Sequence, residues 1–455
     1  MPVARGEPLP PRTAGQGRYR VAGKCPRAPA RDALPARPGA GHWLYSRPIR
    51  PPRFPSVQAC RILVHTATSC LGSGRAAHLE ALAARRSGLS ANDWTTTPLA
   101  TAIGRVPGLE SAPLPADWAR WDCRNNRLAW LGLRQDGLFD TLLELRTRLP
   151  AHRLGIAVGT STASIAETER AYRELDADGG FPADLRRPEI HQPHSLAGFL
   201  QEASGWHGPC LTISTACSSG AKAWAAGARW LQQGLCDAVL VGGCDSLCGS
   251  TLHGFASLQL TSPQACRPFD AGRDGISIGE AAAFAVLVRA GEDDPANAQH
   301  LAGYGESADA HHMSAPHPEG LGARMATLDA LRRAGLAPTD IGYINLHGTA
   351  SRLNDEVEAA MVTGLFPATT LASSTKGWTG HTLGAAGALE ATISLLALEH
   401  GLLPGTLGCT QPDPACGPQL LLENARHPVD AVLSNSFGFG GSNASLVFTR
   451  GNGHD

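Results

Sequence analysis

Short apolar runs that alternate with longer helical patterns limit the fold of this sequence more than any other feature. The runs predict buried strands at 61–66, 154–158, 210–214, 238–241, 283–287, 343–346 and 431–433. Helical patterns lie at 76–85, 221–231, 322–334, 355–363 and 386–400. Continuous apolar strands are covered on both faces, so their alternation with helices predicts a mostly parallel, layered α/β protein.

The chain of 455 residues is long enough for more than one α/β unit. Arginines and prolines dominate residues 1–60, which we interpret as a disordered extension, a transit peptide with an unusual proline content, or translation from a start codon placed too far upstream. An ordered half is expected at 61–293 and a second at 294–455. Each half has a strand that ends in a turn rich in glycine or reactive residues, which suggests an internal duplication.

Composition excludes several classes of protein. A net charge of -1 and a pI near 7.0 argue against a nucleic-acid binder that relies on a global positive field. No apolar run approaches the roughly 20 residues of a membrane span. The twelve cysteines include no pair at C-x-x-C spacing and no zinc-like cluster, so we expect no metal site and a reducing, cytoplasmic location.

Cys217 lies between the apolar run 210–214 and the Ala-rich stretch 221–231. This order predicts a strand, a tight turn and a helix, with the thiol on the turn. The unpaired N–H groups of a helix start carry partial positive charge, so the position predicts a thiol biased toward thiolate. Cysteine is also among the most buried residue types, and packing is the alternative interpretation.

Three polar turns in the second half follow predicted strands. They are His347-Gly348-Thr349, the stretch 376–387 with Lys376 and His381, and the glycine-rich stretch 435–441. Functional groups gather at the carboxyl ends of parallel strands, so we expect these turns to converge on Cys217. Histidines exchange protons at neutral pH, and glycines let backbone N–H groups approach a reacting oxygen.

With these motifs the sequence resembles the β-ketoacyl-acyl-carrier-protein synthases, the condensing enzymes of fatty acid and polyketide assembly. The resemblance covers the chain from about Arg61 to Arg450. Its motifs are Thr215-Ala216-Cys217-Ser218-Ser219, Arg267-Pro268-Phe269-Asp270, Arg273-Asp274-Gly275, His347-Gly348-Thr349, Asn354-Asp355, Gly380-His381 and the loop 435–443. It implies a thiolase-like fold, in which two similar α/β halves form five layers in the order αβαβα, and usually a homodimer.

The resemblance also assigns roles. Cys217 would accept an acyl group from an acyl carrier protein, and His347 and His381 would promote decarboxylation of malonyl-carrier protein by stabilising the enolate oxygen. Backbone N–H groups of Cys217 and Phe439 would hold the oxyanion, and no cofactor is implied. The carbanion would then attack the acyl group and release a β-ketoacyl product.

Five further residues receive supporting roles from the same resemblance. Lys376 matches the family's active-site lysine, with Glu390 as its carboxylate partner, because a buried lysine without an anion is costly. Phe437, together with Phe439, resembles residues that gate the acyl pocket. Arg124 and Arg127 fall where related enzymes place cations that dock the acidic carrier protein, although a solvated helix face is the alternative.

One cysteine with two histidines is typical of the elongating branch of the family. The family's usual Gly-Glu-Gly-Ala-Gly is Gly279-Glu280-Ala281-Ala282-Ala283 here, and Ala350 replaces a usual glycine. With these departures the sequence most resembles the synthases of bacterial aryl-polyene pigment clusters, and three further segments share this resemblance: Tyr304-Gly305-Glu306-Ser307, Ser314-Ala315-Pro316-His317-Pro318 and Arg124-Asn125-Asn126-Arg127. A non-catalytic partner resembling the chain-length factors is the alternative function, and we expect either a homodimer or a heterodimer with such a homologue.

Overall fold

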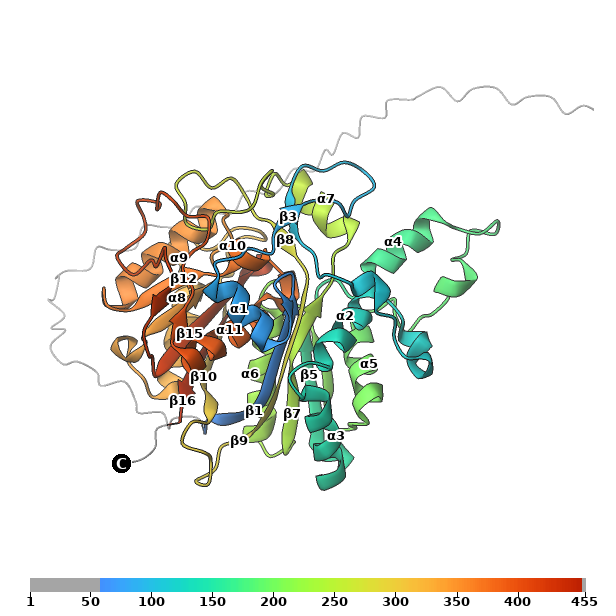
Figure 1. The fold of residues 1–455 in the computed structure, drawn as a ribbon, viewed down its shortest axis with the longest axis horizontal. Coiled ribbons are helices and arrows are strands. Elements are labelled where there is room, and N and C mark those ends of the chain that lie inside the picture. The colour runs from blue at the N-terminus through green and yellow to red at the C-terminus, as the bar shows by residue number, and fades with distance from the viewer. Residues whose placement is uncertain (1–57, 452–455) are drawn as a thin grey trace, which may run out of the picture. The chain divides into compact units, whose positions relative to one another are not determined.

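The computed structural model describes residues 58–451, in which one sheet of eleven strands forms the centre (Figure 1). The predicted extension 1–60 therefore lies almost entirely outside the described residues. The strands of the sheet are β1 (Cys60–Ser69), β2 (Gly72–Ser73), β5 (Leu154–Gly159), β6 (Cys210–Ile213), β7 (Ala238–Asp245), β9 (Ala281–Arg289), β10 (Gln299–Ala308), β11 (Tyr343–Leu346), β12 (Leu371–Ser374), β15 (Ala431–Gly438) and β16 (Ser442–Arg450).

Smaller sheets and the helices complete the described fold. The short strands are β3 (Ser90–Ala91), β4 (Ala102–Gly104), β8 (Ile278–Gly279), β13 (Leu402–Leu403) and β14 (Ala425–Arg426). The α-helices are α1 (Arg75–Ala83), α2 (Arg124–Leu133), α3 (Leu138–Arg148), α4 (Ile165–Arg173), α5 (Ser195–Ser204), α6 (Ser219–Gln232), α7 (Gly249–Ser257), α8 (Leu321–Ala334), α9 (Arg352–Leu365), α10 (Lys376–Thr379) and α11 (Ala386–His400).

The strand order of the large sheet repeats itself. It runs β12-β11-β15-β16-β10-β1-β9-β7-β5-β6, with β2 on the side of β1. Read outward from the antiparallel β1–β10 pair, both directions give the first strand of a set, then its last, its fourth, its second and its third. This repeat supports the suspected duplication and a division near residue 293, which stays a prediction.

The expectation of a mostly parallel sheet is wrong. Four strand pairs are parallel, β5–β6, β5–β7, β11–β12 and β11–β15. In contrast, β9 and β16 run antiparallel to both of their neighbours. Only Phe439–Gly441 separates β15 from β16, which is too short for a crossover connection and forces a hairpin. A continuous apolar run reports that a strand is buried and leaves its direction open.

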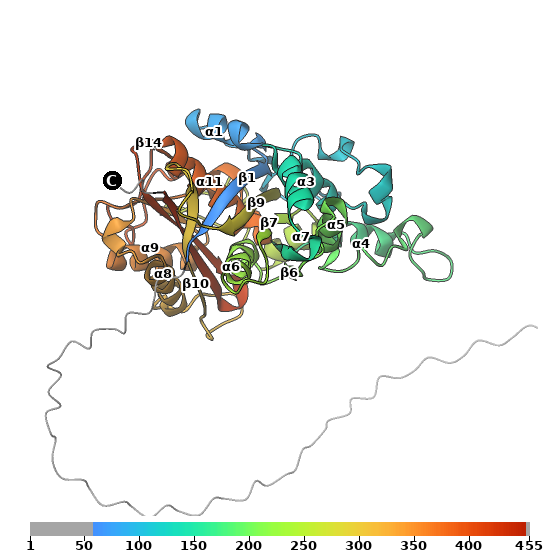
Figure 2. The same ribbon diagram turned by 90° about the horizontal axis from the view of Figure 1, so that it is seen from below.

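The described fold has five layers, in which the two parts of the sheet alternate with three layers of helices (Figure 1). In Figure 1, α2, α3 and α5 cover the right side and α8 and α9 the left, while α6 and α11 lie between the strands. Figure 2 shows the same separation from below, with α3 and α5 beyond β7 and α8 and α9 beyond β10. Helix α11 is buried on every side from Ala386 to Leu398, as expected for a central helix.

The central layer brings the two reactive turns together. Helices α6 and α11 touch through small residues at their first turns. A Cβ added at Gly220 would lie 2.9 Å from the Ala388 nitrogen, and one at Gly387 would lie 2.8 Å from the Ala221 Cβ. This close approach places the turn before α6 beside the turn before α11. No helix in the described part of the chain combines the length and the hydropathy that a membrane span requires.

Candidate active site

Cys217 lies on the predicted turn, between the end of β6 and the start of α6. The preceding residue, Ala216, has a φ of 52°, a left-handed conformation that costs a non-glycine residue on the order of 1–3 kcal/mol. Side chains hold the turn in this shape. The Ser218 hydroxyl donates to the Thr215 carbonyl at 2.9 Å, and the Ser219 hydroxyl donates to the Ala216 carbonyl at 2.6 Å.

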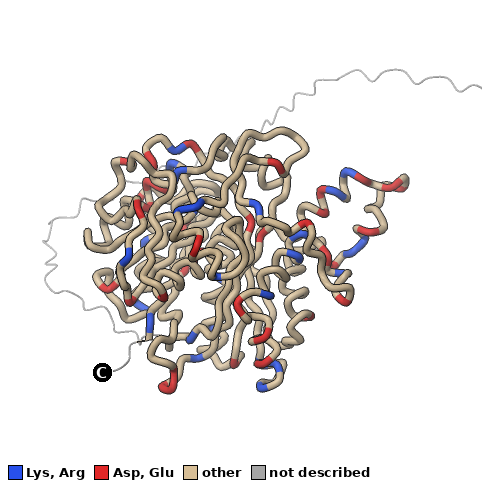
Figure 3. Tube along the Cα trace, in the orientation of Figure 1, with Lys and Arg blue, Asp and Glu red and all other residues tan. Residues whose placement is uncertain are grey.

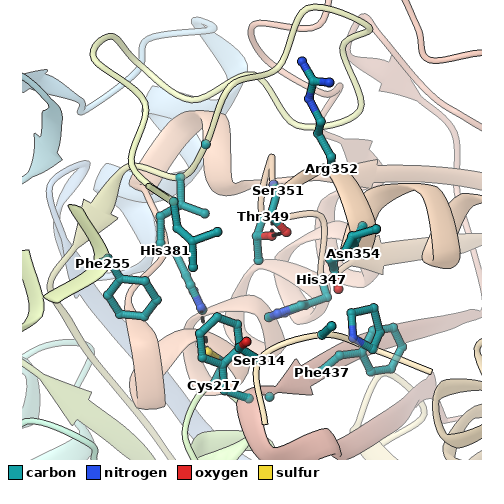
Figure 4. Close-up of a pocket in the computed structure, with 18 of the residues that line it drawn as sticks. Cys217, Phe255, Ser314, His347, Thr349, Ser351, Arg352, Asn354, His381 and Phe437 are labelled. Carbon is teal, nitrogen blue, oxygen red and sulfur yellow. Dashed lines mark hydrogen bonds between the residues drawn. The ribbon is translucent and has the colours of Figure 1, made fainter. Parts of the chain in front are cut away.

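His381 and His347 converge on the thiol. The Nε2 atom of His381 lies 2.9 Å from the Cys217 sulfur (Figure 4). The two imidazole rings are 5.4 Å apart at an angle of 84°, and one ligand-capable atom from each of the three residues falls within 4.8 Å of the others. This constellation unites residues 217, 347 and 381 as the sequence predicted. A thiolate with two imidazoles is also a donor set that suits Zn²⁺, and the described residues contain no other metal-ligand cluster of this kind.

The turn that carries His347 is held by a buried carboxylate that the sequence analysis missed. Glu358 of α9 accepts the backbone N–H groups of His347 and Gly348, each at 2.8 Å, and the Asn435 amide at 3.2 Å. Burial raises the pKa of Glu358 to about 7, and these hydrogen bonds oppose the rise. Its place, eleven residues after His347 on a predicted helix, was the available signal.

Asp245 at the end of β7 is the second carboxylate that the sequence analysis missed. It accepts hydrogen bonds from the hydroxyls of Thr160, Ser161 and Thr162 and from the backbone N–H of Gly384. Gly384 follows His381 by three residues, so Asp245 ties the turn of His381 to the half that carries Cys217. An acidic residue only four positions after the end of the apolar run 238–241 could have indicated this role.

The electrostatics of the thiol differ from the sequence prediction. Burial raises the pKa of Cys217 to about 11, although the Lys376 charge and a hydrogen bond from the Phe439 N–H both lower it. The predicted bias toward thiolate is therefore wrong, because desolvation outweighs the stabilisation from the turn. Burial, together with the charge of Lys376, also lowers the pKa values of His347 and His381 well below their usual range. A neutral thiol thus faces two neutral imidazoles.

Lys376 and Glu390 form the predicted buried ion pair. The ammonium group of Lys376 contacts the Glu390 carboxylate and also donates to the His347 carbonyl, while the two side chains are 1% and 3% exposed. Nζ lies 3.4 Å from Nδ1 of His347. Burial raises the pKa of Glu390 to about 7, and Lys376 opposes the rise. The pair thus fixes the His347 ring from behind.

The glycine-rich loop closes the site from the third side. A Cβ added at Gly438 would lie 2.9 Å from the Thr215 carbonyl, so only glycine permits this approach to the nucleophile turn. Phe437 packs edge-on against His347 with ring centroids 5.8 Å apart. Phe439 is half-buried and lies 5.8 Å from the Phe255 ring. Both phenylalanines therefore border the reacting groups.

A cavity of about 400 Å³ leads from the surface to Cys217. Cys217, His347 and His381 lie at its inner end, and Phe437 and Phe439 form part of its wall. The hydroxyls of Thr349 and Ser351, 2.9 Å apart, line the same wall nearer the surface. The described lining of the cavity thus has the reactive groups at its inner end and the hydroxyls of Thr349 and Ser351 nearer its opening.

Arg124 does not occupy a docking surface. It is 7% exposed, binds Glu280 through two nitrogens and Glu110 through a third, and its guanidinium lies over the Trp94 ring. The buried Glu280 requires this cation, which a sequence pattern could not show. Arg127 is partly exposed but makes a bidentate pair with Asp122. Figure 3 shows Lys and Arg interspersed with Asp and Glu over the described chain.

Two family models match the chain. The N-terminal domain of beta-ketoacyl synthase matches residues 129–293, and the C-terminal domain of beta-ketoacyl synthase matches residues 299–410. The first range contains Cys217, and the second contains His347, Lys376 and His381.

Known relatives agree with these models. The chain is 41% identical over 320 residues to the mitochondrial 3-oxoacyl-acyl-carrier-protein synthase of Arabidopsis thaliana, covering 65% of this chain and 68% of the relative. It is 37% identical over 324 residues to 3-oxoacyl-acyl-carrier-protein synthase 2 of Coxiella burnetii, covering 66% and 76% of the two chains.

Solved structures confirm the predicted thiolase-like architecture. A chain of the complex between the ketosynthase ApeO and its chain length factor ApeC from Xenorhabdus doucetiae superimposes with a TM-score of 0.78 at 35% identity, covering 86% of this chain and 98% of that one. A beta-ketoacyl synthase from Burkholderia phymatum gives 0.77 at 30% identity, with 87% and 100% covered. The fold, the sequence relatives and the family models agree, and the chain belongs to the β-ketoacyl synthase family of acyl-transferring condensing enzymes.

Proposed function

We propose that this β-ketoacyl synthase carries its acyl group on Cys217 and condenses it with a malonyl unit that His347 and His381 decarboxylate. The contact of 2.9 Å between Nε2 of His381 and the Cys217 sulfur is the observation that carries the proposal. A thiol with a raised pKa needs a nearby base, and His381 is placed to supply one.

The first step transfers the acyl group. The Cys217 sulfur attacks the carbonyl carbon of an acyl-carrier-protein thioester, and its proton moves to His381. The bond from the carbonyl carbon to the carrier sulfur breaks, and the departing sulfur takes up that proton. The N–H of Phe439, which donates toward the Cys217 sulfur, lies where it would stabilise the oxyanion together with the N–H of Cys217.

The second step forms the carbon–carbon bond. Malonyl-carrier protein loses carbon dioxide, and the enolate oxygen is held by ring N–H groups of His347 and His381. The α-carbon attacks the acyl carbonyl, the bond to the Cys217 sulfur breaks, and the departing thiolate takes up a proton from water, since the proton lost in the first step left with the carrier thiol. Lys376, fixed by Glu390, orients the His347 ring for this step.

Cys217, His347 and His381 distinguish a catalytic synthase from a non-catalytic partner that resembles a chain-length factor. A chain-length-factor-like partner would not need a thiol in contact with an imidazole, which this chain retains. The likeness to the ApeO ketosynthase is consistent with the resemblance to aryl-polyene synthases. The eleven cysteines of the described chain are all free thiols, which supports a reducing, cytoplasmic location.

A second subunit is proposed at the outer edge of the sheet. β6 pairs only with β5 in the described chain, so its other edge offers unpaired backbone groups, and its Leu211 side chain is 43% exposed. A homologous subunit, identical or not, would cover this edge directly before the nucleophile turn. A Leu211→Lys substitution should then weaken the assembly, so that light scattering gives a lower molar mass than for the parent protein. An unchanged molar mass would place the subunit contact elsewhere.

Mass spectrometry tests the central proposal. Incubation with acyl-carrier protein should add the acyl mass to Cys217, and later addition of malonyl-carrier protein should remove it with release of carbon dioxide. Cys210→Ala, which removes a half-buried thiol in β6, is the matched control and should behave as the parent protein. An unmodified Cys217 after exposure to the acyl donor would refute the proposal.

A further inference from the structure

Arg352 has a distinctive position at the mouth of the active-site cavity. It is the only lysine or arginine among the described residues that line this cavity, and it is exposed. In Figure 4 its guanidinium points outward, away from Cys217 and beyond Ser351. Within the described lining, Arg352 thus supplies the single positive charge of the cavity, on the side where a substrate must enter.

The guanidinium of Arg352 has no partner among residues 58–451, the part of the chain that the structure describes. No hydrogen bond or ion pair of this side chain is found within the described residues, whereas Arg124, Arg127 and Arg273 are all bound to carboxylates. The two acidic residues of the cavity lining are already engaged, since Asp274 accepts from the Ser262 hydroxyl and Asp309 from the Asn443 amide. An unpaired arginine beside committed acids is available for an external anion.

The backbone holds Arg352 in this place. Its carbonyl oxygen accepts a hydrogen bond of 2.9 Å from the buried Arg273. Arg352 is also the first residue of α9, a helix of 14 residues, and the unpaired N–H groups of that first turn add partial positive charge. The side chain can therefore move while its backbone stays fixed. Both the guanidinium charge and the partial charge of the helix N-terminus favour binding of an anion here.

We infer that Arg352 binds the phosphate that joins the pantetheine arm to its carrier. This inference rests on the proposed function, because it assumes that the arm delivers its thioester to Cys217. With the thioester at the inner end and the arm along the wall of Thr349 and Ser351, the phosphate is the anionic group that remains outside. Arg352 is a binding residue for the donor and takes no part in the bond-making steps.

A protection assay reads this contact without turnover. Iodoacetamide alkylates Cys217, and the S-methyl ether of either phosphopantetheine or pantetheine, which has no free thiol to consume the reagent, is added as a competitor, with modification followed by mass spectrometry. Arg352→Gln should raise the half-protecting concentration of phosphopantetheine about tenfold, as expected for a lost charge-assisted hydrogen bond, and leave that of pantetheine unchanged. Arg352→Lys should recover part of the loss, because it keeps the charge but not the fork of donors.

Arg426→Gln is the matched control, since Arg426 is also exposed but lies outside the cavity. An equal loss for both competitors, or no loss for either, would overturn the inference. A loss seen only with a whole carrier protein would place the anion on the protein and overturn the phosphate assignment. If the parent protein accepts no acyl group from acyl-carrier protein, the proposed function fails, while the protection assay still tests Arg352.

Discussion

The two halves of the central sheet have strands in the same order but end them in different chemistry. In the first half the turn after β6 carries a thiol, whereas in the second half the turns after β11 and β12 carry His347 and Lys376. Each half also has its own buried carboxylate, Asp245 for the turn after β5 and Glu358 for the turn after β11. One architecture thus supplies the nucleophile from one copy and the groups that handle protons from the other.

Removing the nucleophile should have the largest effect on condensation, and it should distinguish the role of the first half from that of the second. Cys217→Ala should reduce condensation on the order of 10⁵-fold or more, because no other group can hold the acyl chain. The second half stays intact, so decarboxylation of malonyl-carrier protein should continue and can be followed as carbon dioxide release. Loss of both activities in a folded variant would contradict a division of labour between the halves.

Substitutions in the second half should give the next largest effects. His347→Ala and His381→Ala should each reduce condensation about 10²- to 10⁴-fold, as typical for loss of a general acid or base. Acylation of Cys217 should survive in His347→Ala but slow in His381→Ala, because only His381 contacts the sulfur. Equal acylation rates in the two variants would show that the histidines are interchangeable.

The buried ion pair of the second half should behave as a unit. Lys376→Met and Glu390→Gln should each lower the free energy of unfolding by about 3–5 kcal/mol, since each leaves a buried group without its partner. The double variant should recover much of this loss in urea unfolding. Lys222→Met, at a half-buried lysine of α6 without an ion pair in the described chain, serves as control and should change stability little. Additive losses in the double variant would argue against coupling.

The pH dependence of the thiol measures how the second half acts on the first. With the pKa of Cys217 at about 11, the thiolate fraction grows with pH, so alkylation by iodoacetamide should speed up about tenfold per pH unit from 7 to 10. Lys376→Met should slow alkylation at each pH, because the ammonium charge lowers this pKa. A plateau near pH 8.5 would mean that the thiol behaves as an unperturbed cysteine.

Much of this arrangement could be predicted from the sequence, because motifs with reactive residues follow recognisable strands. The runs at 154–158 and 343–346 and the helix at 386–400 match β5, β11 and α11 closely. Strand β10 was missed because its sequence, QHLAGYGESA, contains two glycines and several polar residues. Those glycines let α8 pack closely, since a Cβ at Gly305 would lie 1.9 Å from the Ala326 carbonyl. The glycines of β10 are therefore explained by a tertiary contact, which the local sequence does not show.

The sequence predicted less of the active site than of the fold. Cys217, His347, His381 and Lys376 lie together as the resemblance implied, but the burial that sets the pKa of the thiol has no sequence signature. Arg124 looked like a surface cation because nothing in its local sequence identifies Glu280 as its partner. Asp245 and Glu358 were missed because their partners, backbone N–H groups together with hydroxyl and amide side chains, lie on other segments of the chain and come close only in the folded structure.

The contact between Cys217 and His381 joins residues 164 positions apart in the chain. Ordering so long a loop carries an entropic cost that only extensive packing of the two halves offsets. We therefore expect the catalytic pair to assemble late, after α6 and α11 have docked through Gly220 and Gly387. Regain of Cys217 acylation during refolding should lag behind regain of helical signal, so the enzyme's own chemistry reports when its folding is finished.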